Sequence, residues 1–176
     1  FPNQTYQISE VHDQAIILEH LLNFETHLAL TNEQITHEDI QSIPLYEESY
    51  VLLTPQNAFK QQRTIIIKSL PLILPSKGLQ VRKHLDDYFM RMNIHPNIVI
   101  EADRFEAATN FVHRGLGYAV IPRFYYQSFN ANNLDAIEIK PKLGRTIFIN
   151  YYKKRKHSER VLSLVDHCKD YWNVIK

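Results

Sequence analysis

The sequence predicts an α/β fold of two small Rossmann-like lobes joined by two crossover strands. Short β-rich runs alternate with amphipathic helices, which is typical of an α/β fold with largely parallel strand pairing. A length of 176 residues allows one domain or two small lobes with a buried core. We place the crossings near residues 50–54 and 149–152. Lobe I is then expected at 1–51 plus 152–176, and lobe II at 52–151.

The first part of the chain is predicted to form three strands and one helix. Residues 5–9 and 27–31 have the composition of strands, and a further strand includes Tyr46 and residues 50–54. A helix is predicted over 12–24 because its apolar side chains recur at helical spacing. These side chains are Ile16, Ile17, Leu21 and Phe24.

The middle of the chain repeats this alternation. Residues 65–67 and 72–74 are β-rich, and 75–78 have the composition of a turn. An amphipathic helix is predicted over 81–92, where the apolar residues follow a spacing of i, i+4, i+7 and i+8. Residues 97–101 are predicted to form a strand.

A second helix in the middle of the chain follows at once. Asp103 is predicted to be its N-cap, and Phe105, Ala108, Phe111 and Val112 form its apolar face. Residues 115–122 are predicted to be a helix exit at glycine that runs into a buried strand ended by proline.

The last part of the chain is predicted to contain two strands and a helix. The strands cover 137–139 and 146–152, with a turn at 141–144 between them. Ser158 is predicted to cap the final helix. Its apolar face consists of Val161, Leu164, Val165, Cys168 and Trp172.

Composition excludes several classes of protein. The net charge of +1 and a single basic cluster at 153–157 do not fit a DNA-binding domain, because phosphate neutralisation requires a clearly basic surface. No apolar run approaches the ~20 residues that span a bilayer, so no membrane association is expected. The single cysteine, Cys168, excludes an internal disulfide framework and favours a cytoplasmic location.

Four sequence segments, in order, resemble the effector-binding domain of LysR-type transcriptional regulators. Residues 111–122 resemble the family's "LV..GLGIALLP" segment, and Phe1–Pro2 its "FP". Residues 44–53 resemble the "L..E.LVLV" crossover strand. Residues 72–89, with Gly78, Arg82 and Asp86, resemble "PLI…G.R..LD..F". The resemblance spans almost the whole chain and implies a type 2 periplasmic-binding-protein-like fold.

The chain also departs from the family. Where the family has "G.LDLAI", this chain has residues 26–30 without the aspartate. The resemblance places the winged helix-turn-helix, the linker helix, and the first strand and helix of the effector domain before Phe1. It therefore implies a fragment in which one wall of the ligand cleft is missing.

Candidate ligand contacts follow from the predicted topology. Ligands of open α/β sheets bind beyond the carboxyl ends of strands, here at the loops 75–80 and 102–105. Unpaired N–H groups at the following helix starts favour a carboxylate, phosphate or sulfate. The resemblance implies contacts at the same loops, near Thr31 and near Pro122. The predicted ligand-binding residues are Thr31, Ser76, Lys77, Gly78, Asp103, Arg104, Phe105, Pro122 and Arg123.

Several of these residues have a simpler structural explanation. Ser76 is equally typical of a turn, Asp103 of a helix cap, and Phe105 has the spacing of a core residue. Arg104 could grip a carboxylate with two hydrogen bonds or could pair with an acidic neighbour. The cationic side chains of Lys77 and Arg123 could equally be solvated.

No catalytic, metal or cofactor site is expected. Although there are nine histidines, no pair has the spacing of a helical zinc site with its glutamate. The sequence contains no G-x-S-x-G elbow, G-x-x-x-x-G-K loop or G-x-G-x-x-G loop. Cys168 lies on the apolar face of the last helix, which favours buried packing over a nucleophile.

The resemblance implies a sensor domain that is not an enzyme. Its expected ligand is a small effector such as an organic acid or another anion, and DNA is expected to be bound only through the missing N-terminal domain. A homodimer or tetramer is expected, with the helix at 12–24 near the helix at 81–92 or 105–115 of a second copy. A solute-binding protein for transport remains the alternative, and an enzyme on the same fold is a third possibility.

Overall fold

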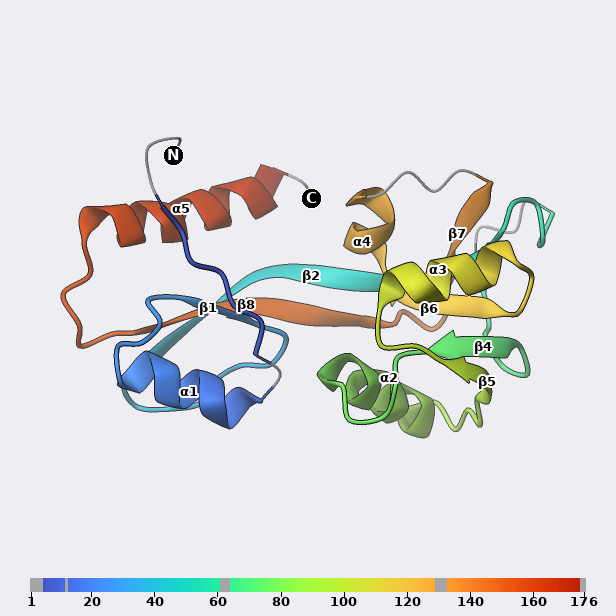
Figure 1. Ribbon diagram of the computed structural model, residues 1–176, viewed down its shortest axis with the longest axis horizontal. Helices are drawn as coiled ribbons and strands as arrows, with labels where there is room; N and C mark the ends of the chain where they lie inside the picture. The colour runs from blue at the N-terminus through green and yellow to red at the C-terminus, as the bar shows by residue number, and fades with distance from the viewer. Residues whose placement is uncertain (1–4, 12, 61–63, 129–132, 175–176) are drawn as a thin grey trace. The chain divides into compact units, whose positions relative to one another are not determined.

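The computed structural model describes residues 5–11, 13–60, 64–128 and 133–174 (Figure 1). Phe1 and Pro2 of the resemblance, and His12 of the first predicted helix, lie outside these described residues. The chain divides into two compact units. Unit 1 consists of Phe1–Tyr46 and Thr146–Lys176, and unit 2 of Glu47–Arg145. The chain passes from one unit to the other after Tyr46 and after Arg145, in each case a few residues before the crossing expected from the sequence.

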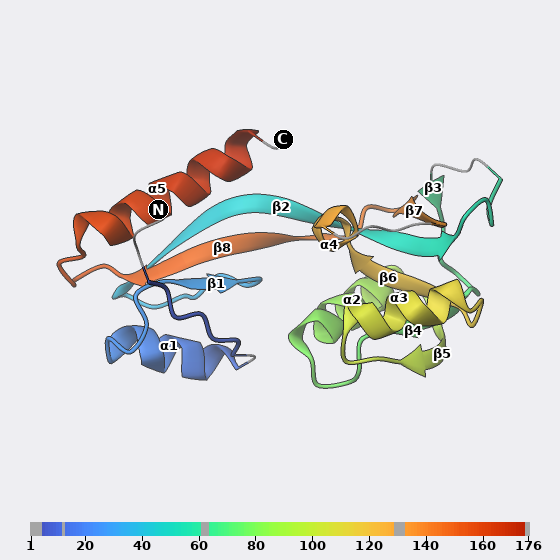
Figure 2. The same ribbon diagram turned by 45° about the horizontal axis from the view of Figure 1, so that its top comes forward.

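Unit 1 has a short sheet between two helices (Figure 2). The strand order is β1-β8-β2, and β1 pairs antiparallel with β8. The strands β2 and β8 continue into unit 2. The elements are α1 (Gln14–Leu22), β1 (Ala29–Thr31), β2 (Ile40–Pro55), β8 (Gly144–Tyr152) and α5 (Glu159–Val174).

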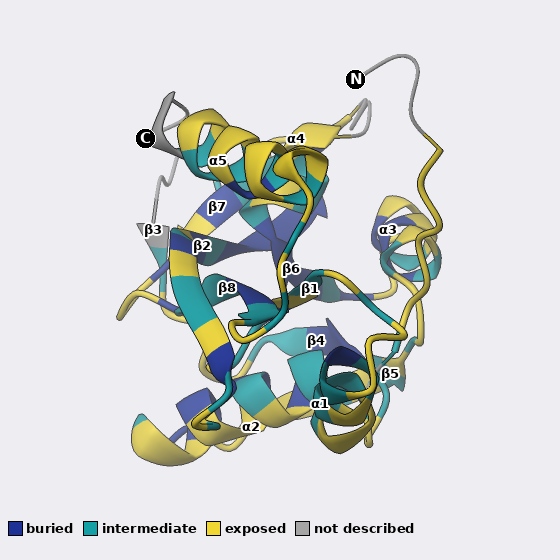
Figure 3. Ribbon diagram, turned by 90° about the vertical axis from the view of Figure 1, so that its left-hand side faces the viewer, coloured by how far each residue is buried: buried dark blue, intermediate teal, exposed yellow. Residues whose placement is uncertain are grey.

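Alternation along the strands of unit 1 produces two apolar clusters. Ala29 of β1 and Tyr152 of β8 pack with Leu21 of α1. Ile149 of β8 packs with Val165 of α5. Successive side chains of a strand point to opposite faces, so α1 and α5 cover opposite faces of this sheet. Most residues of α5 are exposed or half-buried (Figure 3).

Unit 2 is built on the strand order β2-β6-β4-β5. The strand β4 pairs parallel with β5 and with β6, and β2 pairs antiparallel with β6 and β7. A short strand, β3, pairs parallel with β7. The strands are β3 (Thr64–Ile65), β4 (Pro71–Leu74), β5 (Asn97–Glu101), β6 (Tyr118–Pro122) and β7 (Leu134–Ile139). The helices are α2 (Gln80–Arg91), α3 (Phe105–His113) and α4 (Arg123–Ser128).

The sheet of unit 2 is buried on both faces. Leu72 and Leu74 of β4 pack in one cluster with Leu85 of α2, whereas Ile73 packs in a second cluster with Val112 of α3. All five of these residues are at most 1 % exposed. The helices α2 and α3 therefore lie on opposite faces, as expected for parallel strands with crossover helices.

Most of the predicted elements are confirmed, and the differences have physical causes. Residues 5–9 form no strand: they have no strand partner among the described residues, and Ile8 is 92 % exposed. Of the predicted β-run at 65–67, only Ile65 lies in β3, because its partner strand β7 ends at Ile139, the residue paired with Ile65. The interrupted strand predicted at 46–54 is a single strand, β2.

Two further differences concern the ends of elements. The helix α4 was not predicted, because it is only six residues long and follows Pro122 directly. The N-cap of α3 is Arg104 and not Asp103, and its side chain makes no capping hydrogen bond. Pairing is parallel around β4 but antiparallel along β2, so the largely parallel pairing predicted from the sequence holds only in part.

Candidate ligand-binding site

Three parallel strands of unit 2 end at the same edge of the sheet. Leu74 of β4 pairs with Glu101 of β5, and Ile73 of β4 pairs with Ala119 of β6. The loop 75–79, the residues 102–104 and the start of α4 therefore leave the sheet at its carboxyl edge. The structure thus brings together all the predicted ligand-binding residues of unit 2, which are Ser76, Lys77, Gly78, Asp103, Arg104, Phe105, Pro122 and Arg123.

Arg82 ties the two loops of this edge together. Its side chain is only 3 % exposed. The Nη1 atom donates to the Pro75 carbonyl oxygen and to Glu101 Oε1, both at 2.8 Å, and Nε donates to Asp86 Oδ1 at 2.8 Å. Pro75 begins the loop after β4, and Glu101 ends β5. One guanidinium group, with its planar set of donors, thus fixes the relative positions of both strand ends.

The ion pair between Arg82 and Glu101 shifts the pKa values of both side chains. Burial by itself lowers the pKa of Arg82, but the hydrogen bonds and charges of Glu101 and Asp86 outweigh it and raise the pKa. The hydrogen bond from Arg82 holds the pKa of Glu101 below its usual value, and the positive charge and backbone of Lys77 act in the same direction. The ion pair with Arg82 therefore stabilises the ionised form of Glu101 in the folded protein.

The lowered pKa of Glu101 predicts a pH dependence of stability. The contribution of its ion pair is fully present above the pKa of an unfolded glutamate and is lost as the pH falls through the lower pKa of the folded state. We expect Glu101→Gln to lower the melting temperature at pH 7, and the difference from the unmodified chain to decrease as the pH falls below the pKa of an unfolded glutamate. Melting curves of both proteins across this range test it. A difference that persists unchanged at pH 3 would contradict the assignment.

Two of the helices that start at this edge, α2 and α3, have no side-chain cap. The N-cap residues of α2 and α3 are Leu79 and Arg104, and neither makes a side-chain capping bond. In unit 1, by contrast, Asp13 Oδ1 accepts a hydrogen bond from the Ala15 amide of α1 at 2.8 Å. Uncapped helix starts keep N–H groups and the positive end of the helix dipole available to an anion.

Arg104 is an exposed cationic residue at this edge. Its side chain is exposed, and it makes no hydrogen bond or ion pair with any residue in the described part of the chain. The pairing with an acidic neighbour considered from the sequence is therefore not formed there. Lys77 and Asp103 are also exposed, and Gly78 has a φ of +94°, which suits the turn before α2.

The remaining predicted residues of unit 2 are engaged in its own packing. Arg123 donates to Ser49 Oγ and to Glu138 Oε1, each at 3.1 Å. Phe105 packs against Tyr125 with a ring separation of 5.0 Å. Pro122 is buried at the end of β6. The side chains of these three residues therefore help to hold the edge together, whereas Arg104 and the loop 75–79 are accessible to a ligand.

Thr31 lies in unit 1, at the end of β1, and is 8 % exposed. Its hydroxyl donates to the Glu33 carbonyl oxygen at 2.6 Å and accepts from Asn150 Nδ2 at 2.8 Å. Sequence reasoning missed Asn150, because a single asparagine within a strand gives no signal of its position. It also missed the role of Arg82, although Arg82 belongs to one of the resembling segments.

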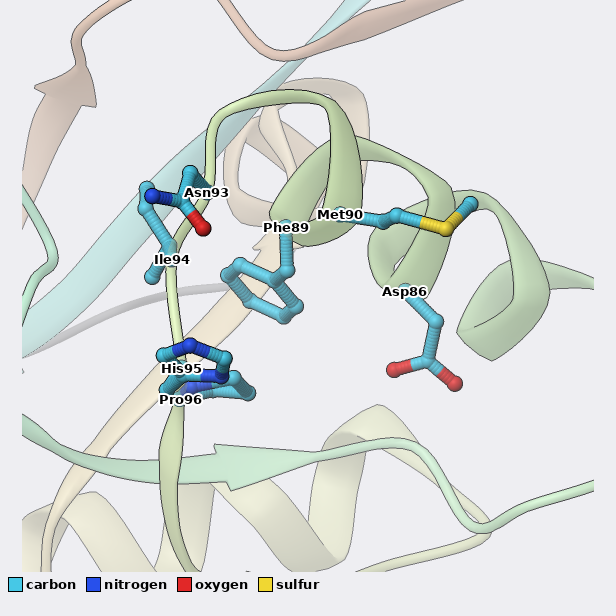
Figure 4. Close-up of a pocket in the computed structure, with 7 residues that line it drawn as sticks. All are labelled: Asp86, Phe89, Met90, Asn93, Ile94, His95 and Pro96. Carbon is cyan, nitrogen blue, oxygen red and sulfur yellow. The ribbon is translucent and has the colours of Figure 1, made fainter.

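A separate hollow of about 320 Å³ lies at the other end of α2 (Figure 4). It is lined by Asp86, Phe89 and Met90 of α2 and by residues 93–96 before β5. This region lies at the amino ends of the parallel strands. Because ligands of open α/β sheets bind at the carboxyl ends, the hollow is not part of the candidate site.

Other types of site were sought in the same structure. Among the described residues, no group of three or more His, Cys, Asp and Glu side chains is arranged to hold a metal ion. Within those residues, no helix is long and apolar enough to cross a membrane.

Comparisons with known proteins agree on one family. The family model of the LysR substrate binding domain matches residues 1–173. The chain is 28 % identical over 160 residues to the uncharacterized HTH-type transcriptional regulator YybE of Bacillus subtilis, covering 88 % of this chain and 54 % of the relative. It is 24 % identical over 130 residues to the regulator YusT of the same organism, covering 74 % and 43 %. The chain thus spans about half the length of these relatives.

Solved structures show the same fold at lower sequence identity. The regulatory domain of Synechocystis CcmR, in complex with 2-PG, has a TM-score of 0.74 at 19 % identity, covering 91 % of this chain and 79 % of that one. The effector-binding domain of QuiR, in complex with shikimate, has a TM-score of 0.70 at 21 % identity, covering 91 % and 78 %. The type 2 periplasmic-binding-protein-like fold expected from the sequence is confirmed by these likenesses.

Proposed function

This chain belongs to the LysR substrate-binding domain family, and from this membership we propose that it senses a small anionic effector at the carboxyl edge of unit 2. The family is one of transcriptional-regulator domains and not an enzyme family. Accordingly, the proposed ligand is bound and released without chemical change. Structural relatives include domains in complex with 2-PG and with shikimate, both of which are small acids.

The observation that carries the proposal is the set of anion-binding features at one edge. Two helix starts without side-chain caps and the unpaired Arg104 meet where β4, β5 and β6 end. A carboxylate or phosphate placed there would gain N–H donors and a guanidinium able to bind it through two hydrogen bonds. The edge is held by the buried Arg82, so little rearrangement is needed before binding.

The proposed output is control of transcription. DNA would be contacted by a helix-turn-helix segment of the full regulator, which works in the cytoplasm as a homodimer or tetramer. Effector binding would shift the regulator between two arrangements, and the shift cannot exceed the difference in effector affinity between them.

A thermal-shift screen of small carboxylates, sugar phosphates and inorganic anions tests the proposed ligand class. A ligand at ~100 times its dissociation constant stabilises the folded chain by about 2.7 kcal/mol. This corresponds to an increase in melting temperature of roughly 5–10 °C for a chain of this size. Recovery of the compound unchanged after incubation separates sensing from catalysis. Stabilisation by uncharged or cationic compounds alone would contradict an anion site.

We expect Arg104→Ala to weaken binding of an acid found in this screen by at least about ten-fold, because two charge-assisted hydrogen bonds are lost. Isothermal titration calorimetry measures the change. Arg114→Ala is the matched control: Arg114 is exposed at the opposite end of the same helix, so its loss should leave the affinity within about two-fold. Equal losses in both variants would indicate general charge attraction and not a site at Arg104.

A further inference from the structure

The hollow at the C-terminal end of α2 has an apolar lining (Figure 4). Phe89 and Ile94 are 2 % and 8 % exposed and form its floor, whereas Met90 beside them is 75 % exposed. An exposed methionine offers a flexible, polarizable surface to an apolar ligand. The volume of about 320 Å³ lies within the range of ligand sites, roughly 300–1,000 Å³, and equals that of about ten water molecules. The hollow therefore has room for a ligand with a single ring.

The carboxylate of Asp86 lines the same hollow. Its Oδ1 atom accepts from Arg82 Nε at 2.8 Å, and the side chain is 49 % exposed. A carboxylate accepts at both oxygens, so Oδ2 can accept a further hydrogen bond from a ligand. Arg82 is shared with Glu101, so the two carboxylates and the one guanidinium together carry a net charge of −1. This charge attracts a cation.

Among the described residues that line the hollow, none is a lysine or an arginine. The helix α2 ends at Arg91, and the C-terminal end of a helix carries a partial negative charge. The ring of Phe89 lies between Asp86 on one side and His95 and Pro96 on the other (Figure 4). An apolar group on this ring is therefore close enough for its substituent to reach Asp86. The hollow favours the charge opposite to that favoured at the start of α2.

We propose that this hollow is a second ligand site, which binds a small primary amine with an apolar body of one ring. The ammonium group donates to Asp86 Oδ2, in a charge-assisted hydrogen bond. The ring packs on Phe89, Ile94 and Met90 and is removed from water. The site lies at the other end of α2 from the carboxyl edge, so it does not depend on the proposed anionic effector.

Four probes separate the contribution of the charge from that of the ring. Benzylamine carries both, benzyl alcohol only the ring, ethylamine only the charge, and benzoate the ring with the opposite charge. Proton–nitrogen NMR titrations of the chain give the dissociation constants and locate the amides that shift. We expect benzylamine to bind at least about ten-fold more tightly than each of the others. Its largest shifts should lie within residues 86–96, which include the whole lining.

A matched pair of variants connects the binding to Asp86. Asp86→Asn removes the charge of the carboxylate and should weaken the binding of benzylamine by at least about ten-fold. Asp87→Asn makes the same change of charge at the next residue of α2, which is exposed and does not line the hollow. Its affinity for benzylamine should stay within about two-fold of that of the unmodified chain, because solvent and salt screen this charge.

A second pair of variants at Met90 leaves the hydrogen bond between Arg82 and Asp86 in place. Position 90 follows Asp86 by four residues, so a lysine introduced there pairs with Asp86 on the helix surface and competes with the ligand. We expect Met90→Lys to weaken the binding of benzylamine by about ten-fold, whereas Met90→Leu keeps an apolar wall and should stay within about two-fold. Because Met90 is exposed, both variants should fold, which melting curves confirm.

Several outcomes would overturn the proposal. They are equal affinities for benzylamine and benzyl alcohol, benzylamine shifts centred outside residues 86–96, and the absence of benzylamine binding at millimolar concentrations. Benzylamine binding that is unchanged in Met90→Lys would also overturn it, and this result is independent of whether Asp86→Asn folds. None of these outcomes bears on acid sensing at the carboxyl edge, which the screen of anions tests separately.

Discussion

Replacing Arg82 with methionine is expected to lower the free energy of unfolding by about 3 kcal/mol, because three hydrogen bonds of a buried guanidinium are lost. Methionine fills most of the volume of the arginine stem, so the change reports the polar contacts. The Pro75 carbonyl would remain buried without this donor. Glu101 and Asp86 are 38 % and 49 % exposed and can be rehydrated, which keeps the loss below that of a fully buried pair.

The loss should appear as a decrease in melting temperature of roughly 10 °C and in chemical denaturation at constant m-value. Arg91→Met is the matched control, since Arg91 lies on the same helix, is exposed, and lies over the ring of Tyr88 with its guanidinium carbon 5.9 Å from the ring centroid. Its effect should stay within about 1 kcal/mol. The loss in the free energy of unfolding for Arg82→Lys should lie between those of Arg82→Met and Arg91→Met, because an ammonium group cannot donate to Pro75, Glu101 and Asp86 with the same geometry.

The surroundings of Arg82 show which features of the fold could be predicted from the sequence. Local patterns predicted the helix on which it lies and the two loops at its start, because periodicity and turn composition depend on nearby residues. The convergence of these loops at one edge follows from general rules for parallel sheets. The long-range contact between Arg82 and Glu101 could not be predicted, because it depends on the register between β4 and β5.

In the candidate site, too, local features could be predicted from the sequence and long-range contacts could not. The sequence singled out Arg104 from its place after a strand, and the resemblance implied a contact near Thr31; in the structure Arg104 follows β5 and Thr31 is the last residue of β1. It did not identify the buried Asn150, whose hydrogen bonds to Ala29 and Thr31 depend on the pairing of two strands far apart in the chain. Nor could it separate Arg104 from Arg123, because only the structure shows which arginine already has partners.

Gly117→Ala is expected to lower the free energy of unfolding by about 2–3 kcal/mol, because an added Cβ would overlap with atoms that cannot easily move and because the φ of +156° is unfavourable for alanine. It would lie 2.9 Å from the Pro71 carbonyl oxygen, 3.1 Å from Val99 Cγ2 and 3.2 Å from Ile73 Cγ1. Gly117 directly precedes β6, and these three neighbours belong to β4 and β5. The sequence indicated glycine as a helix exit here, but close approach to two other strands is a tertiary property.

Gly115→Ala is the comparison for a positive φ without crowding, since Gly117 also has a positive φ, of +156°. Gly115 has a φ of +70°, and an added Cβ there would meet nothing within 4 Å, so we expect a loss of only about 1 kcal/mol from the unfavourable backbone angle. Denaturant unfolding of both variants measures the difference, and equal losses would contradict the crowding explanation. Because β6 carries Pro122 and the start of α4 to the carboxyl edge, a shift of its first residues should also weaken effector binding in Gly117→Ala. In Gly115→Ala the affinity should be unchanged, since the strand register is left intact.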